Sequence, residues 1–209
     1  MLITLQDLES RERRYRATFI NSLSGFRQVV LVGTRSAEGV ANLAIFNSLL
    51  HVGASPPLYG LLFRPDTVRR DTLHNILESG SYTLNYITGA DFEKGHQTSA
   101  KYGKGVSEFE AVGFHEEYKD HSPAPFIKEA VVKIAMKFEE RVDIRINGTI
   151  LIIGRVLSAE LDEELVAEDG FVALEQANVL ACAGLDAYYT ADFKGRLSYA
   201  KPEEWPKLL

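Results

Sequence analysis

Arginines, hydroxyl side chains and a carboxylate gather at one point near the middle of the chain: Arg64, Thr67, Arg70, Asp71 and Thr72. They lie just before and at the start of residues 71–78, whose apolar spacing predicts a short helix. The first turn of a helix has free backbone N–H groups, and together with hydroxyls and cations these bind phosphate. Asp71 would repel a phosphate, so we expect it to cap the helix or to accept from a ligand hydroxyl. The same residues are also typical of a capped helix with surface arginines, and both interpretations stay open.

A second polar group lies on the strand predicted over 40–48. It consists of Asn42, Asn47 and Ser48. Amide and hydroxyl groups at a strand end suit the polar edge of a ring, but they are also common where a strand gives way to a turn. The two groups together predict a site for an anionic ligand that carries a ring.

Several other kinds of site are excluded by their missing motifs. The chain has no GxGxxG between a strand and a helix, no P-loop and no GxSxG, and Gly103-Lys104-Gly105 is too short to bind phosphate in the manner of a P-loop. The five histidines form no HExxH pattern, so we expect no metal site. The one cysteine, Cys182, lies among small apolar residues and is expected to be a buried, unreactive thiol.

Size and composition are those of one globular domain, which we expect to span residues 1–209. The chain is 45% hydrophobic and 25% charged, with a net charge of -6. An acidic chain has no bulk field to attract nucleic acid. No apolar run approaches the ~20 residues of a membrane span, and the charged N-terminus lacks the apolar core of a signal peptide. We therefore expect a cytoplasmic protein without nucleic-acid or membrane partners.

The elements that must position the polar groups are mostly strands. Strands are predicted over 28–35, 40–48, 58–64, 82–87, 130–144 and 149–161, with an extended segment at 122–125. Helices are predicted over about 7–23, 71–78 and 91–101, and residues 169–176 are a short helix or a turn.

Two features refine this organisation. Asn147-Gly148 separates the two longest strands and predicts a tight type I′ hairpin. Residues 89–126 break the strand pattern, and such an excursion is expected either to cover a site or to extend a subunit contact. Because strands do not alternate with helices, we predict a mainly β protein with a closed antiparallel barrel.

The order of motifs over residues 39–86 resembles the flavin reductase-like family of FMN-binding split barrels. That family includes flavoredoxins and the reductases of two-component monooxygenases. The matching residues are Gly39, Asn42, Ala44, Phe46, Ser48, Pro56, Pro57, Arg64, Asp71, Thr72, Asn75 and Asn85. The similarity is clearest over 24–88 and continues weakly to about 195. It implies a six-stranded antiparallel split barrel and a homodimer with FMN near the subunit interface.

The resemblance also implies a set of cofactor-binding residues. Asn42, Ala44, Phe46, Asn47 and Ser48 would lie along the flavin ring and ribityl chain, Arg64, Thr67, Arg70, Asp71 and Thr72 would hold the phosphate, and Asn85 completes the set. No catalytic side chain is expected, because the flavin carries the chemistry. The implied function is an FMN-binding oxidoreductase that passes hydride from NADH or NADPH to flavin N5 and electrons to an unidentified acceptor, with an oxygenase as a possible partner.

Two departures from the family pattern keep alternatives open. The usual Pro-Phe-Ser reads Ile45-Phe46-Asn47-Ser48, and Cys182-Ala183-Gly184 replaces a C-terminal histidine-glycine signature. The second departure favours a flavin-binding electron carrier or sensor without nicotinamide turnover. The first favours a dimeric binding module that has no enzymatic activity.

Overall fold

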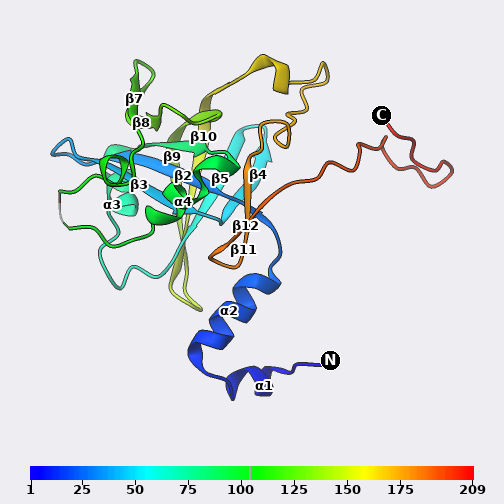
Figure 1. The fold of residues 1–209 in the computed structure, drawn as a ribbon, viewed down its shortest axis with the longest axis horizontal. Coiled ribbons are helices and arrows are strands. Elements are labelled where there is room, and N and C mark those ends of the chain that lie inside the picture. Colours follow the sequence, from blue (N-terminus) through cyan, green and yellow to red (C-terminus); the bar gives the residue numbers. More distant parts are fainter. Residues whose placement is uncertain (104) are drawn as a thin grey trace.

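A seven-stranded antiparallel sheet forms the split barrel of the computed structural model, which describes residues 1–103 and 105–209 (Figure 1). Its order is β3-β2-β6-β9-β10-β5-β4. The strands are β2 (Val30–Arg35), β3 (Ala41–Phe46), β4 (Leu49–Ala54), β5 (Pro57–Phe63), β6 (Ser81–Tyr86), β9 (Val132–Ile144) and β10 (Thr149–Leu161). The predicted mainly β, antiparallel split barrel is confirmed. The sheet has one strand more than expected, because the chain turns back through Ser55-Pro56 and pairs β4 with β5.

Besides the barrel sheet, the described chain has two small sheets and five short helices, of which α1 and α2 project away from the barrel (Figure 1). β1 (Arg27–Gln28) pairs with β11 (Leu180–Ala183), which pairs with β12 (Ala187–Thr190), while β7 (Glu116–Lys119) pairs with β8 (Ser122–Ile127). The helices are α1 (Leu5–Glu9), α2 (Arg13–Leu23), α3 (Asp71–Ser79), α4 (Phe92–Gln97) and α5 (Glu108–Val112), with 3-10 turns η1 (Gly89–Asp91) and η2 (Glu163–Leu165). Over the described ranges, no helix has the length and apolar character needed to cross a membrane.

The sheet separates two apolar cores. Val30, Val32 and Ile152 face the barrel interior, which α3 closes with Leu73 and Ile76. The other face of the sheet is covered by the excursion and by β11, and this second core holds Leu31, Leu43, Ile87, Phe109 and Ile127. Alternate residues of β2 therefore enter different cores, as expected for a strand that is buried on both faces.

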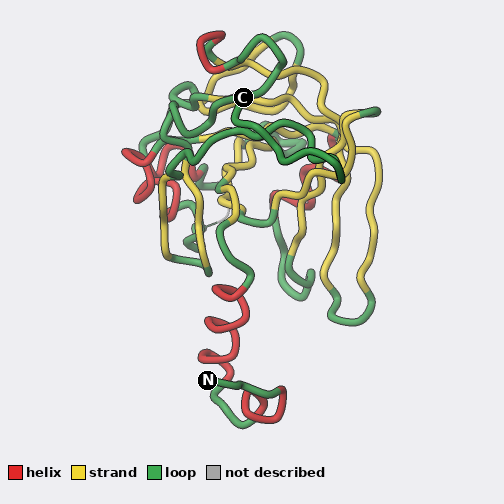
Figure 2. The backbone as a smooth tube through the Cα atoms, turned by 90° about the vertical axis from the view of Figure 1, so that its right-hand side faces the viewer, coloured by secondary structure: helices red, strands yellow, loops and turns green. Residues whose placement is uncertain are grey.

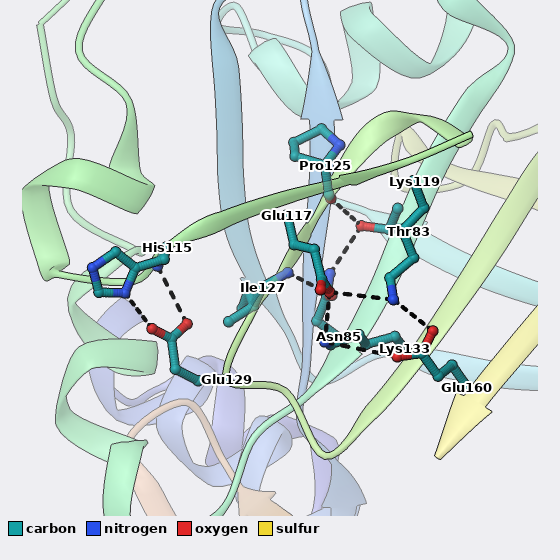
Figure 3. Close-up of polar contacts among 10 residues, drawn as sticks. All are labelled: Thr83, Asn85, His115, Glu117, Lys119, Pro125, Ile127, Glu129, Lys133 and Glu160. Carbon is teal, nitrogen blue, oxygen red and sulfur yellow. Dashed lines mark hydrogen bonds and ion pairs between the residues drawn. The ribbon is translucent and has the colours of Figure 1, made fainter. Parts of the chain in front are cut away.

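The β7–β8 hairpin is attached to the barrel by polar contacts from several strands (Figure 3). Thr83 Oγ1 donates to Pro125 O over 2.6 Å, and Ile127 N donates to Asn85 Oδ1 over 2.9 Å. Around the hairpin, the contacts Lys133–Glu117, Lys119–Glu160 and His115–Glu129 complete the network. These contacts hold the β7–β8 hairpin of the excursion over one face of the sheet.

The N-terminal segment differs from the single helix expected over 7–23. A capping box between Thr4 and Asp7 starts α1, and Ser10 Oγ donates back to Asp7 O over 2.7 Å at its end. The prediction of one continuous helix is therefore wrong, since α1 stops at Glu9 and α2 begins at Arg13.

The predicted type I′ turn at Asn147-Gly148 is also wrong. Ile144 pairs with Thr149, so four residues, 145–148, join β9 to β10. Gly148 has φ +73°, whereas Asn178 is the one non-glycine residue with positive φ in the described chain. A type I′ turn needs positive φ at both central residues. The strands extend further than the pattern suggested, and only the glycine takes the left-handed conformation.

The excursion and the late turns differ in smaller ways. α4 ends at Gln97, so the helix expected over 91–101 is shorter, and residues 169–176 form turns. α5 was not predicted, although Ser107-x-x-Glu110 is a capping-box pattern. Lys104, in the glycine-lysine-glycine stretch, lies outside the described residues.

The close packing of β8 on β2 makes Gly33 a sensitive position. A Cβ there would lie 2.2 Å from Pro125 O and 2.5 Å from Thr83 Oγ1. We expect Gly33→Ala to lower the free energy of unfolding by about 3 kcal/mol or more, as measured by urea denaturation. Gly53→Ala on β4 is the matched control, because its nearest contact would be an ordinary 3.5 Å to Pro56 O. Equal losses in the two variants would contradict the close approach of β8.

Candidate functional site

The start of α3 brings the two predicted polar groups together. Asn42 Nδ2 donates to Thr72 Oγ1 over 3.0 Å, and Asn75 Nδ2 donates to Thr34 Oγ1 over 3.1 Å. Thr34 and Asn42 lie opposite each other on β2 and β3. Two asparagine–threonine bonds therefore hold the first turns of α3 against the sheet. Asn42 and Thr72, which are distant in sequence, become direct neighbours.

The loop before α3 presents its charged groups outward. Arg70 is the N-cap residue and makes no side-chain cap bond; its guanidinium donates from Nε and Nη2 to Pro65 O, both over 3.3 Å. Asp71 is the first helical residue, and its carboxylate accepts from Arg69 Nε over 2.8 Å. The carboxylate of Asp71 thus neutralises a neighbouring arginine and leaves the N–H groups of the first turn uncapped by a side chain.

A pocket of about 280 Å³ lies beside this turn. Its apolar lining includes Leu73 and Leu77, and its polar lining consists of one carboxylate, one hydroxyl, two guanidinium groups and one imidazole: Asp66, Thr67, Arg69, Arg70 and His74. Arg64 lies at the end of β5 with an exposed side chain and does not line the pocket. Hydroxyl, guanidinium and helical N–H groups at one place suit an anion such as a phosphate.

The predicted ring-binding residues follow β3, an edge strand of the barrel sheet. Ala44 is half-buried between Asn42 and Phe46 on one face of the strand. The Phe46 ring packs edge-on against Phe63, with centroids 4.8 Å apart. Ser48 Oγ donates to Leu62 O over 2.9 Å and so fixes the end of β3 to β5.

Asn47 connects this strand end to the C-terminal hairpin. Its Nδ2 donates to Gly184 O over 2.7 Å, and Arg27 Nη2 donates to the same carbonyl over 3.2 Å. Cys182 lies next to this junction, with its Sγ 3.8 Å from Asn47 Nδ2. The thiol is free and buried, as expected, and burial raises its pKa.

Asn85 is not brought to the group around α3. Its side chain is fully buried, donates to Leu31 O and Thr83 Oγ1, and accepts from Ile127 N (Figure 3). These bonds satisfy the amide inside the protein. The structure therefore uses Asn85 to hold β8, and we leave it out of the proposed site.

Glu108 is a site residue that the sequence reasoning missed. Its Oε2 accepts from Leu43 N on β3 over 3.0 Å, between Asn42 and Ala44. Burial raises the pKa of this carboxyl and the nearby Asp71 adds to the effect, while the bond from Leu43 opposes it. The adjacent Ser107 Oγ is buried and has no partner among the described residues. The one local signal for this helix is the capping-box pattern Ser107-x-x-Glu110, which the sequence analysis did not use and which gives no reason to place the helix against β3.

The described residues contain no group of three or more His, Cys, Asp or Glu side chains that could hold a metal ion. What the arrangement offers is an anion pocket at the start of a helix, continued along the edge of a strand by amides, a small residue and a partly buried carboxylate. Such a layout suits binding of an elongated anionic ligand.

Comparisons with known proteins agree with this layout. The family model described as "Flavin reductase like domain" matches residues 25–177. YwrF of Bacillus subtilis, a protein without an assigned function, is 30% identical over 156 residues, which cover 72% of this chain and 76% of that one.

Two solved structures share the fold. A Shewanella frigidimarina protein, provisionally described as a flavin reductase with a split barrel domain, is 43% identical, with a TM-score of 0.92 over 96% of this chain and all of that one. Nitrilotriacetate monooxygenase component B from Bacillus cereus is 20% identical, with a TM-score of 0.82 over 94% of this chain and 98% of that one. At that identity the second likeness shows the fold alone.

The raised pKa of Glu108 has a consequence for stability. An acid whose pKa is higher in the folded state binds more protons when folded, so stability falls as pH rises from its ordinary value of 4.5 through the raised value. Glu108→Gln keeps an oxygen that can accept from Leu43 N but cannot ionise. We expect the variant to gain stability relative to the parent protein between pH 4 and pH 7, as measured by urea denaturation. Glu110→Gln, an exposed position on the same helix, is the control. A difference that stays constant with pH, or that reverses, would contradict the assignment.

Proposed function

This chain belongs to the flavin reductase-like domain family, and from that premise we propose that it is an FMN-dependent oxidoreductase. When bound, the flavin supplies the chemistry: it accepts a hydride at N5 from NADH or NADPH and delivers electrons to an acceptor. The observation that carries the proposal is the junction of β3 with α3. There the Asn42–Thr72 bond joins a strand edge suited to a ring to a helix start suited to a phosphate.

The residues present fit FMN in their donor chemistry. Thr67 and Arg70 line the pocket at the helix start, and Arg64 has an exposed guanidinium nearby in sequence. A charged, bidentate guanidinium is a strong phosphate donor. We assign Thr67, Arg70 and Thr72, with Arg64 and the α3 N–H groups, to the phosphate. Asp71 lies beside these groups and forms an ion pair with Arg69.

The strand residues have a different task. The side chains of Asn47 and Ser48 donate hydrogen bonds to Gly184 O and Leu62 O. We therefore propose that these two residues fix the end of β3, and that the backbone of β3 contacts the ring. The small side chain of Ala44 allows the ring to approach the strand, and Phe46 anchors the strand by packing against the barrel core. The unpartnered hydroxyl of Ser107 adds a polar group beside the same strand. In this arrangement the protein orients the flavin without a protein acid or base.

We also propose that the protein is a homodimer. Each copy would form a single domain over residues 1–209, and the protein would be located in the cytoplasm. Tyr199 and Trp205 in the C-terminal tail are each 89% exposed. Large apolar side chains gathered on a surface mark an association site. The electron acceptor is unassigned, and an oxygenase is one class of partner that we propose to test.

A flavin-binding electron carrier or sensor is the second candidate. The buried, high-pKa Cys182 stands where many reductases of the family carry a histidine-glycine signature, and Gly184 is occupied by bonds from Asn47 and Arg27. A nicotinamide would have to be held by other groups. This observation favours a protein that holds flavin and exchanges electrons with a partner instead.

The visible absorption spectrum of the purified protein distinguishes these functions. We expect flavin bands that bleach on anaerobic addition of NADH or NADPH. Bands that bleach with dithionite but persist with both nicotinamides would support the carrier or sensor. If no bands appear after FMN is added and the excess removed, the flavin proposal fails and the binding module without flavin takes its place.

Substitutions at the phosphate group test the placement of the cofactor. We expect Arg64→Ala, Arg70→Ala and Thr72→Ala each to weaken FMN binding about tenfold or more, because a hydrogen bond to a charged group is worth about 1.5–3 kcal/mol. Riboflavin, which lacks the phosphate, should bind the variants and the parent protein equally. Arg145→Ala, at an exposed arginine in the β9–β10 loop, is the control. Unchanged FMN affinity in all three variants, measured by fluorescence titration, would refute the site.

A further inference from the structure

Helix α2 carries apolar and basic side chains that its own chain does not cover. None of its residues is buried. Tyr15, Phe19 and Leu23 recur at helical spacing and form one stripe; the Tyr15 and Phe19 rings stack 6.2 Å apart, and Leu23 is 69% exposed. The ribbon in Figure 1 and the backbone tube in Figure 2 both show α2 standing away from the barrel. A helix this short gains little stability on its own, so its stripe needs a packing surface.

The arginines of α2 also lack ion-pair partners in the described part of the chain. Arg13, Arg14 and Arg16 lie on the helix, and no ion pair in the described part of the chain involves them. Three arginines without a carboxylate partner give α2 a basic surface beside its apolar stripe.

Residues 160–175, here called the acidic segment, show the opposite charge. They contain seven carboxylates, and no lysine or arginine occurs from 156 to 193. Glu160 and Asp169 are paired with Lys119 and Arg196. Glu163, Glu164 and Glu168 have no ion pair among the described residues. The segment also exposes apolar side chains, Val166 by 40% and Phe171 by 36%.

The two surfaces match each other but cannot meet within one chain. α2 lies at one end of the molecule and the acidic segment, yellow to gold in Figure 1, at the other, and the quarter turn between the two views preserves this separation. A two-fold axis would bring α2 of one copy to the acidic segment of the other, and the reverse contact would form at once. Three free arginines would then face three free glutamates, with apolar side chains between them.

We propose that α2 docks on the acidic segment of a second copy of this chain. The inference rests on the homodimer proposed above but not on flavin binding. The docked pair covers the stripe of α2, neutralises both charged surfaces and orients the two copies side by side and antiparallel, so that both contacts form at once. Because the contact is partly ionic, it weakens as salt screens the charges.

Charge reversal with rescue tests the docking on the full-length protein. Molar mass by light scattering and dimer dissociation by analytical ultracentrifugation are measured for the parent protein, for Arg13→Glu/Arg16→Glu, for Glu163→Arg/Glu164→Arg and for the fourfold combination. We expect a parent dimer, dissociation at least about tenfold easier in each double variant, and recovery in the fourfold variant. Lys101→Glu/Lys128→Glu, an equal charge change at exposed lysines elsewhere, should leave the dimer unchanged. Far-ultraviolet circular dichroism checks that every variant is folded.

Three results would overturn the inference. A parent mass of one chain removes the second copy as the occupant. Double variants that dimerise as well as the parent show that the dimer uses another surface. Weakening without recovery in the fourfold variant shows that the two patches do not face each other. Measurements with and without added FMN separate a failure of the docking from a failure of the flavin proposal.

Discussion

The packing of β8 on β2 and β6 is the contact on which the rest of the arrangement depends. It requires a glycine at position 33, because Pro125 O occupies the place of a side chain, and it is held by the buried bonds of Thr83 and Asn85. Through it Phe109, Phe114 and Ile127 of the excursion become part of the second core. Once β8 is fixed, α5 lies against β3 and the Glu108 carboxylate can reach Leu43 N.

The candidate site is therefore assembled from two sides of the sheet edge. α3 approaches β3 from the barrel opening and places Thr72 on Asn42, while α5 approaches from the outer core and places Glu108 on the next residue. A ligand along β3 would lie between the start of α3 and the carboxyl group of Glu108. The start of the helix favours negative charge, and burial makes ionisation of the Glu108 carboxyl less favourable.

Local patterns predicted much of this structure, and long-range contacts account for what they missed. Alternating apolar residues and turn signals located six strands, and the resemblance placed Asn42 and Thr72 in one site before any contact between them was known. The same reasoning put Asn85 in that site, since an amide on a strand looks alike whether it faces a ligand or the loop it holds. The roles of Asn85 and Glu108 depend on partners about 42 and 65 residues away in sequence, which no local pattern specifies. The extra strand β4 and the four-residue β9–β10 loop depend similarly on strand register.

The distribution of charge carries information that the net value of -6 conceals. That value argues against a partner bound by a bulk electrostatic field. Yet the chain separates its charges into a basic helix near one terminus and an acidic segment far from it, each exposed with apolar side chains. In a dimer that brings α2 of one copy to the acidic segment of the other, the opposite charges would be paired. In a monomer, both charged surfaces would stay in water. At the α3 pocket, Asp66 lies in the lining beside Arg69 and Arg70, and Asp71 pairs with Arg69. Arg70 is therefore the pocket arginine without an ion-pair partner among the described residues, and it is the one that we propose for the anionic cofactor.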